Sequence, residues 1–234
     1  MGDHSENYIV EDLLLNGFKI YQSPSLYRFT SDAVVLSRFA KKGAKRVMDL
    51  CSGSGIVGLH YYAVNQGEGT ETVTLCELQR PLAEMSEETV KVNGLENVFT
   101  VLNQPLQTLS ETGEYDLVMC NPPYKKRGSG IRLSNEHLDI CRNETAVTLE
   151  EIVSKAAGLL SRGGRLCMCN AVDRLIETVV LFEKNKIYPS RNRFVSAKED
   201  KDPYLFLIEG IKGKRSALVA ERQSVNASKN FSGE

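Results

Sequence analysis

Apolar runs of five to seven residues alternate along this chain with longer segments in which apolar positions recur every three or four residues. The short runs predict strands, and the longer segments predict amphipathic helices. Strands are expected at 46–50, 72–77, 98–102, 115–120, 165–170, 191–197 and 203–209, with helices at 33–39, 56–65, 80–93, 149–161 and 173–184. The alternation predicts an α/β fold with a doubly wound, mostly parallel, seven-stranded sheet of the Rossmann-like kind.

Length and composition indicate the domain organisation. The chain is 41% hydrophobic and 25% charged, which suits a single domain of residues 1–234 better than two small ones. The Rossmann-like core is expected over 45–210. Ahead of it, residues 1–13 look like a polar lead-in, and 15–22 predict a short strand or hairpin. Residues 216–234 predict a flexible tail.

Composition also bears on location and partners. No apolar run is long enough to cross a membrane, and the acidic N-terminus lacks the apolar segment of a secretory signal. The six cysteines show no zinc-type or thioredoxin-type spacing, so we expect reduced core residues and a cytoplasmic protein. With a net charge of −1, nucleic-acid binding needs a local basic patch. Candidate patches are Lys125, Lys126 and Arg127, and a cluster at 212–215.

A glycine-rich turn follows the first strand of the predicted core. Gly53, Gly55 and Gly58 form a G-x-G-x-x-G pattern between a strand and a helix, which indicates a nucleotide-like ligand but does not distinguish NAD, FAD and S-adenosylmethionine. Asp49, at the strand's tip, is poorly placed beside a pyrophosphate and suits the ammonium of a methionine moiety. Glu77 ends the second strand, where an acid can accept hydrogen bonds from ribose hydroxyls. Leu78 or Gln79 would flank an adenine.

The most specific signal is the sequence Asn121-Pro122-Pro123-Tyr124, directly after the fourth strand. Two prolines restrict the backbone there. The Asn121 side-chain oxygen and the Pro122 carbonyl can accept both hydrogens of a conjugated NH2 group, and Tyr124 can stack on its ring. This arrangement makes the nitrogen lone pair available and stabilises the cation that develops during methyl transfer. The motif therefore predicts a planar amine as the substrate.

These residues make the chain resemble S-adenosylmethionine-dependent N-methyltransferases, and more closely the bacterial tRNA1(Val) (adenine-37-N6)-methyltransferase family. The resemblance runs from about residue 11 to about 215 and implies a class I methyltransferase fold. It assigns S-adenosyl-L-methionine as cofactor and Asp49, Gly53, Gly55, Glu77 and Asn121 as cofactor-binding positions. Asn121, Pro122 and Tyr124 would be catalytic, and Pro123 and Tyr124, with the adjacent Lys125, Lys126 and Arg127, would bind the substrate.

The resemblance also covers the segment ahead of the cofactor loop. In the family this segment, here 1–40, covers the cofactor, which gives Thr30 and Asp32 a cofactor role. The chain departs from the family after the third strand, where Pro105 replaces an aspartate that meets the cofactor adenine. Gln104 or Asn103 is the expected substitute.

Alternatives remain open at this point. The same turn occurs in methyltransferases of ribosomal RNA and of the release-factor glutamine, although the latter carry a helical domain that the residues before Asp49 are too few to form. A cofactor- or RNA-binding module without catalysis and a dehydrogenase explain the second motif less well. The resemblance implies RNA, most simply tRNA, as partner. Neither a membrane nor a stable protein partner is expected, and the expected state is a monomer.

Overall fold

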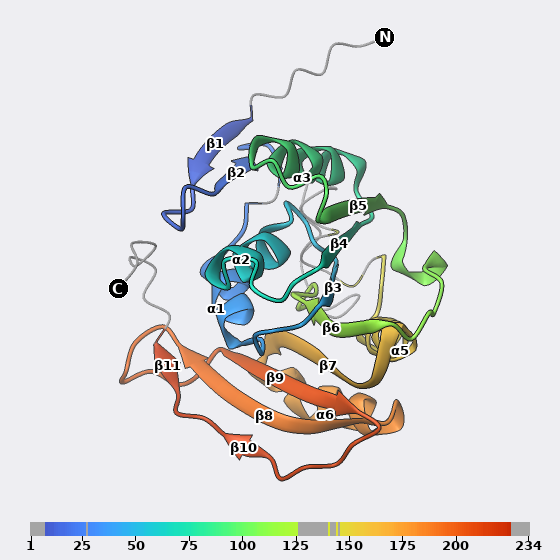
Figure 1. Ribbon diagram of the computed structural model, residues 1–234. Helices are drawn as coiled ribbons and strands as arrows, with labels where there is room; N and C mark the ends of the chain where they lie inside the picture. Colours follow the sequence, from blue (N-terminus) through green and yellow to red (C-terminus); the bar gives the residue numbers. More distant parts are fainter. Residues whose placement is uncertain (1–7, 27, 126–139, 141–143, 145, 226–234) are drawn as a thin grey trace.

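The computed structural model describes residues 8–26, 28–125, 140, 144 and 146–225. Within them the main sheet has nine strands. Its principal strands lie in the order β5 (Phe99–Asn103), β4 (Thr72–Glu77), β3 (Arg46–Leu50), β6 (Tyr115–Cys120), β7 (Leu160–Ala171), β9 (Leu205–Lys212) and β8 (Ile187–Ser196). All pairs from β5 to β7 are parallel, and β9 is antiparallel to both of its neighbours. The expected doubly wound, mostly parallel sheet is confirmed (Figure 1).

Helices cover both faces of this sheet. They are α1 (Ser31–Phe39), α2 (Ile56–Val64), α3 (Arg80–Val92), α5 (Leu149–Leu159) and α6 (Leu175–Lys184), with short 3-10 turns at Leu106–Thr108 and Val172–Arg174. Val47 packs in one apolar cluster with α1 and α2, whereas its neighbour Met48 packs in a second cluster with α5 and α6. Because successive strand residues point to opposite faces of the sheet, one almost continuously apolar strand contributes side chains to both apolar clusters.

An N-terminal hairpin lies beside the main sheet. Strands β1 (Ile9–Asp12) and β2 (Lys19–Gln22) pair antiparallel, so the expected hairpin forms, but its first strand lies within the stretch expected to be a polar lead-in. The free side of β2 is held by α3, because the Lys19 and Tyr21 amides donate to Asn93 Oδ1 (2.8 Å) and Thr89 Oγ1 (3.0 Å). This anchor places the segment before α1 at the edge of the sheet where β3, β4 and β6 end.

The C-terminal part of the chain, beyond β9, runs along the edge strand β8. Strands β10 (Val219–Ala220) and β11 (Ser224–Val225) each pair parallel with β8, so this part of the expected flexible tail carries regular structure. Glu221, between them, forms ion pairs with Arg191 and Arg193. Pairing in this way covers a sheet edge that would otherwise expose unpaired backbone groups.

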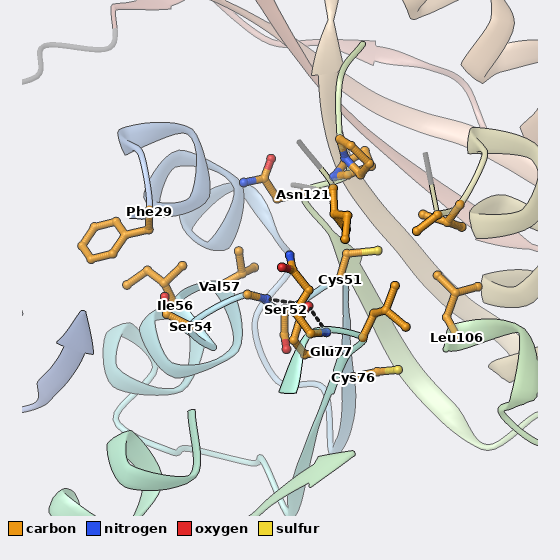
Figure 2. A pocket seen from close by; sticks show the side chains of 18 of the residues that line it. Phe29, Cys51, Ser52, Ser54, Ile56, Val57, Cys76, Glu77, Leu106 and Asn121 are labelled. Carbon is orange, nitrogen blue, oxygen red and sulfur yellow. Dashed lines mark hydrogen bonds between the residues drawn. The ribbon is translucent and has the colours of Figure 1, made fainter. Parts of the chain in front are cut away.

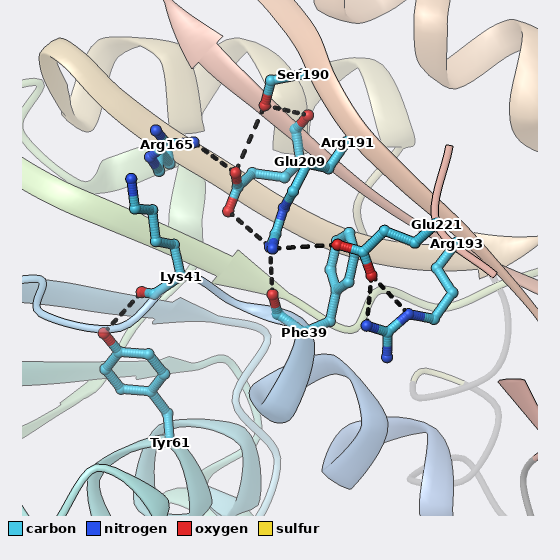
Figure 3. A network of polar contacts seen from close by, with 9 residues as sticks. All are labelled: Phe39, Lys41, Tyr61, Arg165, Ser190, Arg191, Arg193, Glu209 and Glu221. Atoms are coloured by element: carbon cyan, nitrogen blue, oxygen red, sulfur yellow. Dashed lines mark hydrogen bonds and ion pairs between the residues drawn. The ribbon is translucent and has the colours of Figure 1, made fainter. Parts of the chain in front are cut away.

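A buried charge network ties α1 to the β8–β9 hairpin (Figure 3). Glu209, fully buried on β9, forms ion pairs with Arg165 (2.5 Å) and Arg191 (3.3 Å). Arg191 also donates to the Phe39 carbonyl, at the end of α1, and its guanidinium lies 4.5 Å from the centre of the Phe39 ring. Arg191 thus pairs with both Glu209 and Glu221, and its bond to the Phe39 carbonyl links the end of α1 to this network.

No helix among the described residues is both long and apolar enough to span a bilayer.

Candidate active site

A pocket of about 360 Å³ opens at the carboxyl edge of the sheet, where the parallel strands β3, β4, β5 and β6 end. This is the edge at which open α/β sheets bind their ligands, and the volume is within the range of small-molecule sites. Figure 2 shows Phe29 and Leu106 on opposite sides of the pocket, with Asn121 above Glu77. Of the residues predicted for the site, the lining contains Thr30, Asp32, Gly53, Glu77, Leu78, Gln104, Asn121, Pro122, Pro123, Tyr124 and Lys125.

Some predicted residues within the described part of the chain are missing from that lining. Asp49 and Gly55 lie outside it, and their contacts are described below. Lys126 and Arg127 lie outside the described residues. Cys51, Phe29 and Val147 line the pocket without having been predicted. The positions of Phe29 and Cys51 beside predicted site residues could have indicated them, whereas Val147 gave no signal.

The three glycines of the turn have different roles. Gly53 has a φ of +56°, and a Cβ built there would meet no atom within 4 Å, so the backbone is open to a ligand. Gly55 has a φ of +78°, and its Cβ would lie 2.8 Å from Leu75 Cδ1. A Cβ on Gly58 would lie 2.7 Å from Leu75 Cδ2. The second and third glycines therefore allow α2 to approach β4, and only the first faces the pocket.

Asp49 lies near the end of β3, as expected, and is fully buried behind this turn. Its Oδ2 accepts a hydrogen bond from the Gly58 amide (3.0 Å), whereas Oδ1 has no partner among the described residues. Burial raises the pKa of the Asp49 carboxyl to about 7, and the nearby Glu77 carboxylate adds to the rise. An orphaned carboxylate oxygen next to a glycine loop is suited to a cationic ligand group, directly or through water.

Glu77 is the acid at the base of the pocket. Its Oε2 accepts from the Gly53 amide (2.8 Å) and its Oε1 from the Gln79 amide (2.8 Å), so the side chain is held across the loop (Figure 2). Burial raises its pKa despite these backbone hydrogen bonds. Each carboxylate oxygen can accept a further hydrogen bond. The two oxygens are therefore available to a diol.

The side of the pocket expected to receive an adenine is mostly apolar. Leu78, Pro105 and Leu106 line it together with Gln104. Asn103 is not part of the lining, because its Nδ2 donates to the carbonyls of Glu77 and Leu78 (3.0 Å each). Of the two substitutes for the missing aspartate, Gln104 is therefore the one whose side chain borders the pocket.

The Asn-Pro-Pro-Tyr turn faces the glycine loop across the pocket. Tyr124 donates its hydroxyl hydrogen to Asn121 Oδ1 (2.7 Å), and the Cys169 thiol donates to the same oxygen (3.1 Å). The sequence did not indicate Cys169. Its place follows from strand order, because the register pairs Cys120 with Met168 and so brings the next residue of β7 beside Asn121.

Asp32 lies on the other side of the Tyr124 hydroxyl. Its Oδ2 is 3.4 Å from Tyr124 Oη, and its Oδ1 accepts from the Tyr204 hydroxyl (2.8 Å). Asp32 comes from the first turn of α1 and Tyr204 from the residue before β9. Three segments far apart in the sequence thus meet at the Asn-Pro-Pro-Tyr turn.

The end of that turn is fixed by a buried ion pair. The Glu144 amide donates to the Lys125 carbonyl (2.8 Å). The Glu144 carboxylate accepts from Arg174 Nη1 (2.6 Å) and from the Leu149 amide (2.9 Å), and neither charged side chain is more than 8% exposed. Thr148 caps the adjacent start of α5 in a capping box with Glu151. Lys125 itself is exposed at the pocket's rim.

The second predicted basic cluster lies elsewhere. Since β9 is antiparallel, its last residue, Lys212, is at the edge where β7 begins, away from the pocket. Lys212 donates to the Leu160 carbonyl (2.7 Å), and Arg215 forms an ion pair with Glu183 (2.8 Å). The structure therefore gives no reason to include the 212–215 cluster in the site.

Histidine takes no part in the described site. His60 is buried between α1 and α2, where its Nδ1 is 2.7 Å from Ser37 Oγ. Burial lowers its pKa to about 4. His4 and His137 lie outside the described residues.

Comparisons with known proteins agree with this geometry. The chain is 25% identical over 224 residues to the tRNA1(Val) (adenine(37)-N6)-methyltransferase of Tolumonas auensis, a match that covers 95% of this chain and 89% of that one. A predicted O-methyltransferase from Agrobacterium tumefaciens superposes with a TM-score of 0.64 at 19% identity, covering 83% of this chain and 86% of that one. For Pyrococcus horikoshii TYW2 in complex with MeSAdo, the TM-score is 0.62 at 15% identity, with coverages of 90% and 73%.

The two structural likenesses establish the fold, which is the one expected from the sequence. A family model described as the methyltransferase small domain matches residues 30–194. This range holds Asp32, the glycine loop, Glu77 and the Asn-Pro-Pro-Tyr turn. Because the match covers well over half of the chain, the protein belongs to the methyltransferase small domain family, and the expectation of a methyltransferase is confirmed.

Proposed function

We propose that this protein transfers a methyl group from S-adenosyl-L-methionine to the exocyclic N6 amine of an adenine in RNA, and that the adenine lies in the anticodon loop of a tRNA. The observation that carries the proposal is one pocket lined by both the cofactor loop and the Asn-Pro-Pro-Tyr turn. The name of the Tolumonas auensis relative supports the choice of tRNA over ribosomal RNA.

The pocket's chemistry fits the cofactor. The Glu77 carboxylate suits the ribose hydroxyls, and the open backbone at Gly53 lets the ligand approach closely. The orphaned Asp49 Oδ1, buried behind the lining, suits a cationic methionine group through water. When bound, S-adenosyl-L-methionine supplies an electrophilic methyl group on a sulfonium. Leu78, Leu106 and Gln104 would surround its adenine.

The chain's own residues would prepare the amine. Asn121 Oδ1 and the Pro122 carbonyl accept the two amine hydrogens, which draws the nitrogen lone pair out of conjugation and toward the methyl carbon. Held this way, the nitrogen would accept the methyl group, and the electrons of the broken S–C bond would leave with the sulfur of the cofactor. The proton leaves the nitrogen afterwards, so the reaction needs no histidine near the pocket.

Asn121→Ala tests this role. The variant should bind S-adenosyl-L-methionine as the wild type does and lose methyl transfer, because the substituted side chain acts on the amine. Calorimetry measures cofactor affinity, and tritiated-methyl incorporation measures transfer. Asn185→Ala is the matched control, since Asn185 caps the far end of α6. Full turnover by Asn121→Ala would remove the chemical argument.

The substrate class needs a separate test. Tritiated-methyl transfer into bulk tRNA, ribosomal RNA and release factor, measured side by side, should label tRNA. Mass spectrometry of nucleosides from cells lacking the protein should then show the loss of an N6-methyladenosine from tRNA. Label found only in protein would instead favour the release-factor glutamine.

Lys125, at the pocket's rim, is proposed to contact a phosphate of the RNA, with Lys126 and Arg127 beside it in the sequence. Lys125→Ala should raise the Michaelis constant for RNA and flatten its dependence on salt, by a slope of about 0.7 to 0.9 for one phosphate contact. Lys45→Ala is the control, because Lys45 lies next to the start of β3, at the opposite edge of the sheet. An unchanged salt slope for Lys125→Ala would exclude the contact.

We also propose that the protein acts as a monomer in the cytoplasm. The five cysteines in the described part of the chain are free thiols, which agrees with a reducing compartment. Light scattering on the purified protein tests the monomer, and fractionation of cells tests the compartment.

A further inference from the structure

The oxygen proposed to receive the substrate amine is already engaged. Asn121 Oδ1 accepts one hydrogen bond from the Tyr124 hydroxyl (2.7 Å) and another from the Cys169 thiol (3.1 Å). An amide oxygen has two lone pairs. An amine that donates to this oxygen must therefore displace one of the two donors.

The structure offers the Tyr124 hydroxyl a second acceptor. Asp32 Oδ2 lies 3.4 Å from Tyr124 Oη, longer than the present bond to Asn121 but close enough to take over the hydrogen with a small movement. The carboxylate is buried, at 9% exposure, and hydrogen bonds to charged acceptors are stronger than those to neutral ones. When the Tyr124 hydroxyl turns from Asn121 to Asp32, it still has an acceptor for its hydrogen.

Asp32 is itself held in place from two sides. The Tyr204 hydroxyl donates to its Oδ1 (2.8 Å). At the other end of α1, Arg191 donates to the Phe39 carbonyl and ties the helix to β8 (Figure 3). The β8–β9 hairpin thus fixes both ends of the helix that carries the carboxylate.

We propose that Asp32 is a positioning residue for the amine-binding turn: it receives the Tyr124 hydroxyl when the substrate amine binds and so frees Asn121 Oδ1, with Tyr204 orienting its carboxylate. The resemblance assigns Asp32 to the cofactor, and its contacts with Tyr124 and Tyr204 give it this role at the turn. The inference rests on the proposed amine substrate, and it concerns how the site opens an acceptor for that amine.

A double-mutant cycle tests the exchange. Asp32→Asn removes the charged acceptor and should raise the Michaelis constant for RNA by roughly 10- to 100-fold, the equivalent of one hydrogen bond to a charged group. In the Tyr124→Phe background, which lacks the hydroxyl, the same substitution should change the constant by less than about threefold. The dissociation constant for S-adenosyl-L-methionine, measured by calorimetry, should stay within about threefold of the wild type in all variants.

Three results would overturn the proposal. Additive effects of Asp32→Asn and Tyr124→Phe would show that Asp32 does not act through the hydroxyl. A loss of cofactor affinity in Asp32→Asn would make it a cofactor ligand. An equal effect of Asp116→Asn would make the change a general one, because Asp116 accepts the Lys45 and Arg46 amides at the opposite edge of the sheet.

A spectroscopic experiment distinguishes failure of this proposal from failure of the proposed RNA substrate. In protein labelled with ¹³C at tyrosine Cζ, the Tyr124 resonance, assigned with Tyr124→Phe, should shift in Asp32→Asn without any RNA present. Tyr204→Phe should shift it in the same direction by a smaller amount. If the Tyr124 resonance shifted in neither variant, the Asp32 contact would be refuted. If it shifted but the protein did not methylate RNA, the contact would stand and only the proposed substrate would be refuted.

Discussion

The buried ion pair behind the amine-binding turn provides a quantitative prediction. Arg174 and Glu144 are only 3% and 8% exposed, and their charged atoms are 2.6 Å apart. Arg174→Met removes the cation and leaves the Glu144 carboxylate in a nearly dry environment, with the Leu149 amide as its remaining described donor. We therefore expect a large loss of stability from a substitution that hardly changes the volume of the side chain.

The expected magnitude follows from this burial. Breaking a buried pair by removing one partner costs about 3–5 kcal/mol, because an uncompensated charge stays inside the protein. For a domain of this size each kcal/mol lowers Tm by about 2–4 °C, so the shift should be about 6–20 °C. Replacing both residues, as in Glu144→Gln with Arg174→Met, should restore part of the loss because no charge remains buried.

Urea unfolding followed by circular dichroism measures the difference. The matched control is Lys184→Met, which breaks an ion pair with Glu150 whose side chains are 64% and 59% exposed. Exposed pairs are worth about 1 kcal/mol or less, so the control should hardly change the midpoint. If Arg174→Met were no more destabilising than Lys184→Met, the pair would not anchor the segment after Lys125, and the argument from burial would fail.

Three further predictions concern buried groups near the pocket. Gly58→Ala should lower the unfolding free energy by about 1–3 kcal/mol, because its Cβ would lie 2.7 Å from Leu75 Cδ2 and the end of the leucine side chain would have to move. Denaturant titration measures this loss. Asp49 has its pKa raised from 3.8 to about 7, so the folded state holds a proton that the unfolded state releases, and stability at this site falls as the pH rises from about 4 to about 7. Asp49→Asn should flatten that part of the stability–pH curve. Calorimetry should show the affinity for S-adenosyl-L-methionine rising with pH through about 7 in the wild type and not in this variant. His60 has its pKa lowered from 6.5 to about 4, so stability should fall as the pH drops between those values, and His60→Gln should remove that slope from acid titrations of the folded protein.

Much of the fold could be predicted because its signals are local. The strands 72–77 and 115–120 have the expected bounds, and α1 begins one residue after Thr30. The β7 strand starts at Leu160, ahead of the expected start at 165. Gly163 adopts a φ of +83° and Gly164 has no room for a Cβ beside the Tyr115 carbonyl, so the strand continues through a bulge. The tail strands β10 and β11 were missed because two residues are too few to show a period.

The site residues were likewise predictable where the signal is local, and not where packing between distant segments decides their position. Strand tips carry Glu77 and Asn121, and parallel strands end at one edge, so their meeting at one pocket could be inferred from order along the chain. The burial of Asp49 could not be predicted, because a strand tip in the sequence does not reveal which face its side chain takes, and α2 packs over this side chain. Cys169 and Tyr204 gave no signal at all.

The sequence by itself predicted an α/β fold with a glycine loop, a carboxylate at the second strand's end and an Asn-Pro-Pro-Tyr turn, and its resemblance to N-methyltransferases predicted the activity. Packing between distant segments decided the rest: which glycine faces the ligand, that Asp49 is buried, and that Asn121 Oδ1 already holds two donors. The reason is physical. Backbone preference and hydrophobic period act over a few residues, whereas burial, pKa and the occupancy of a lone pair depend on which side chains the strand order brings together.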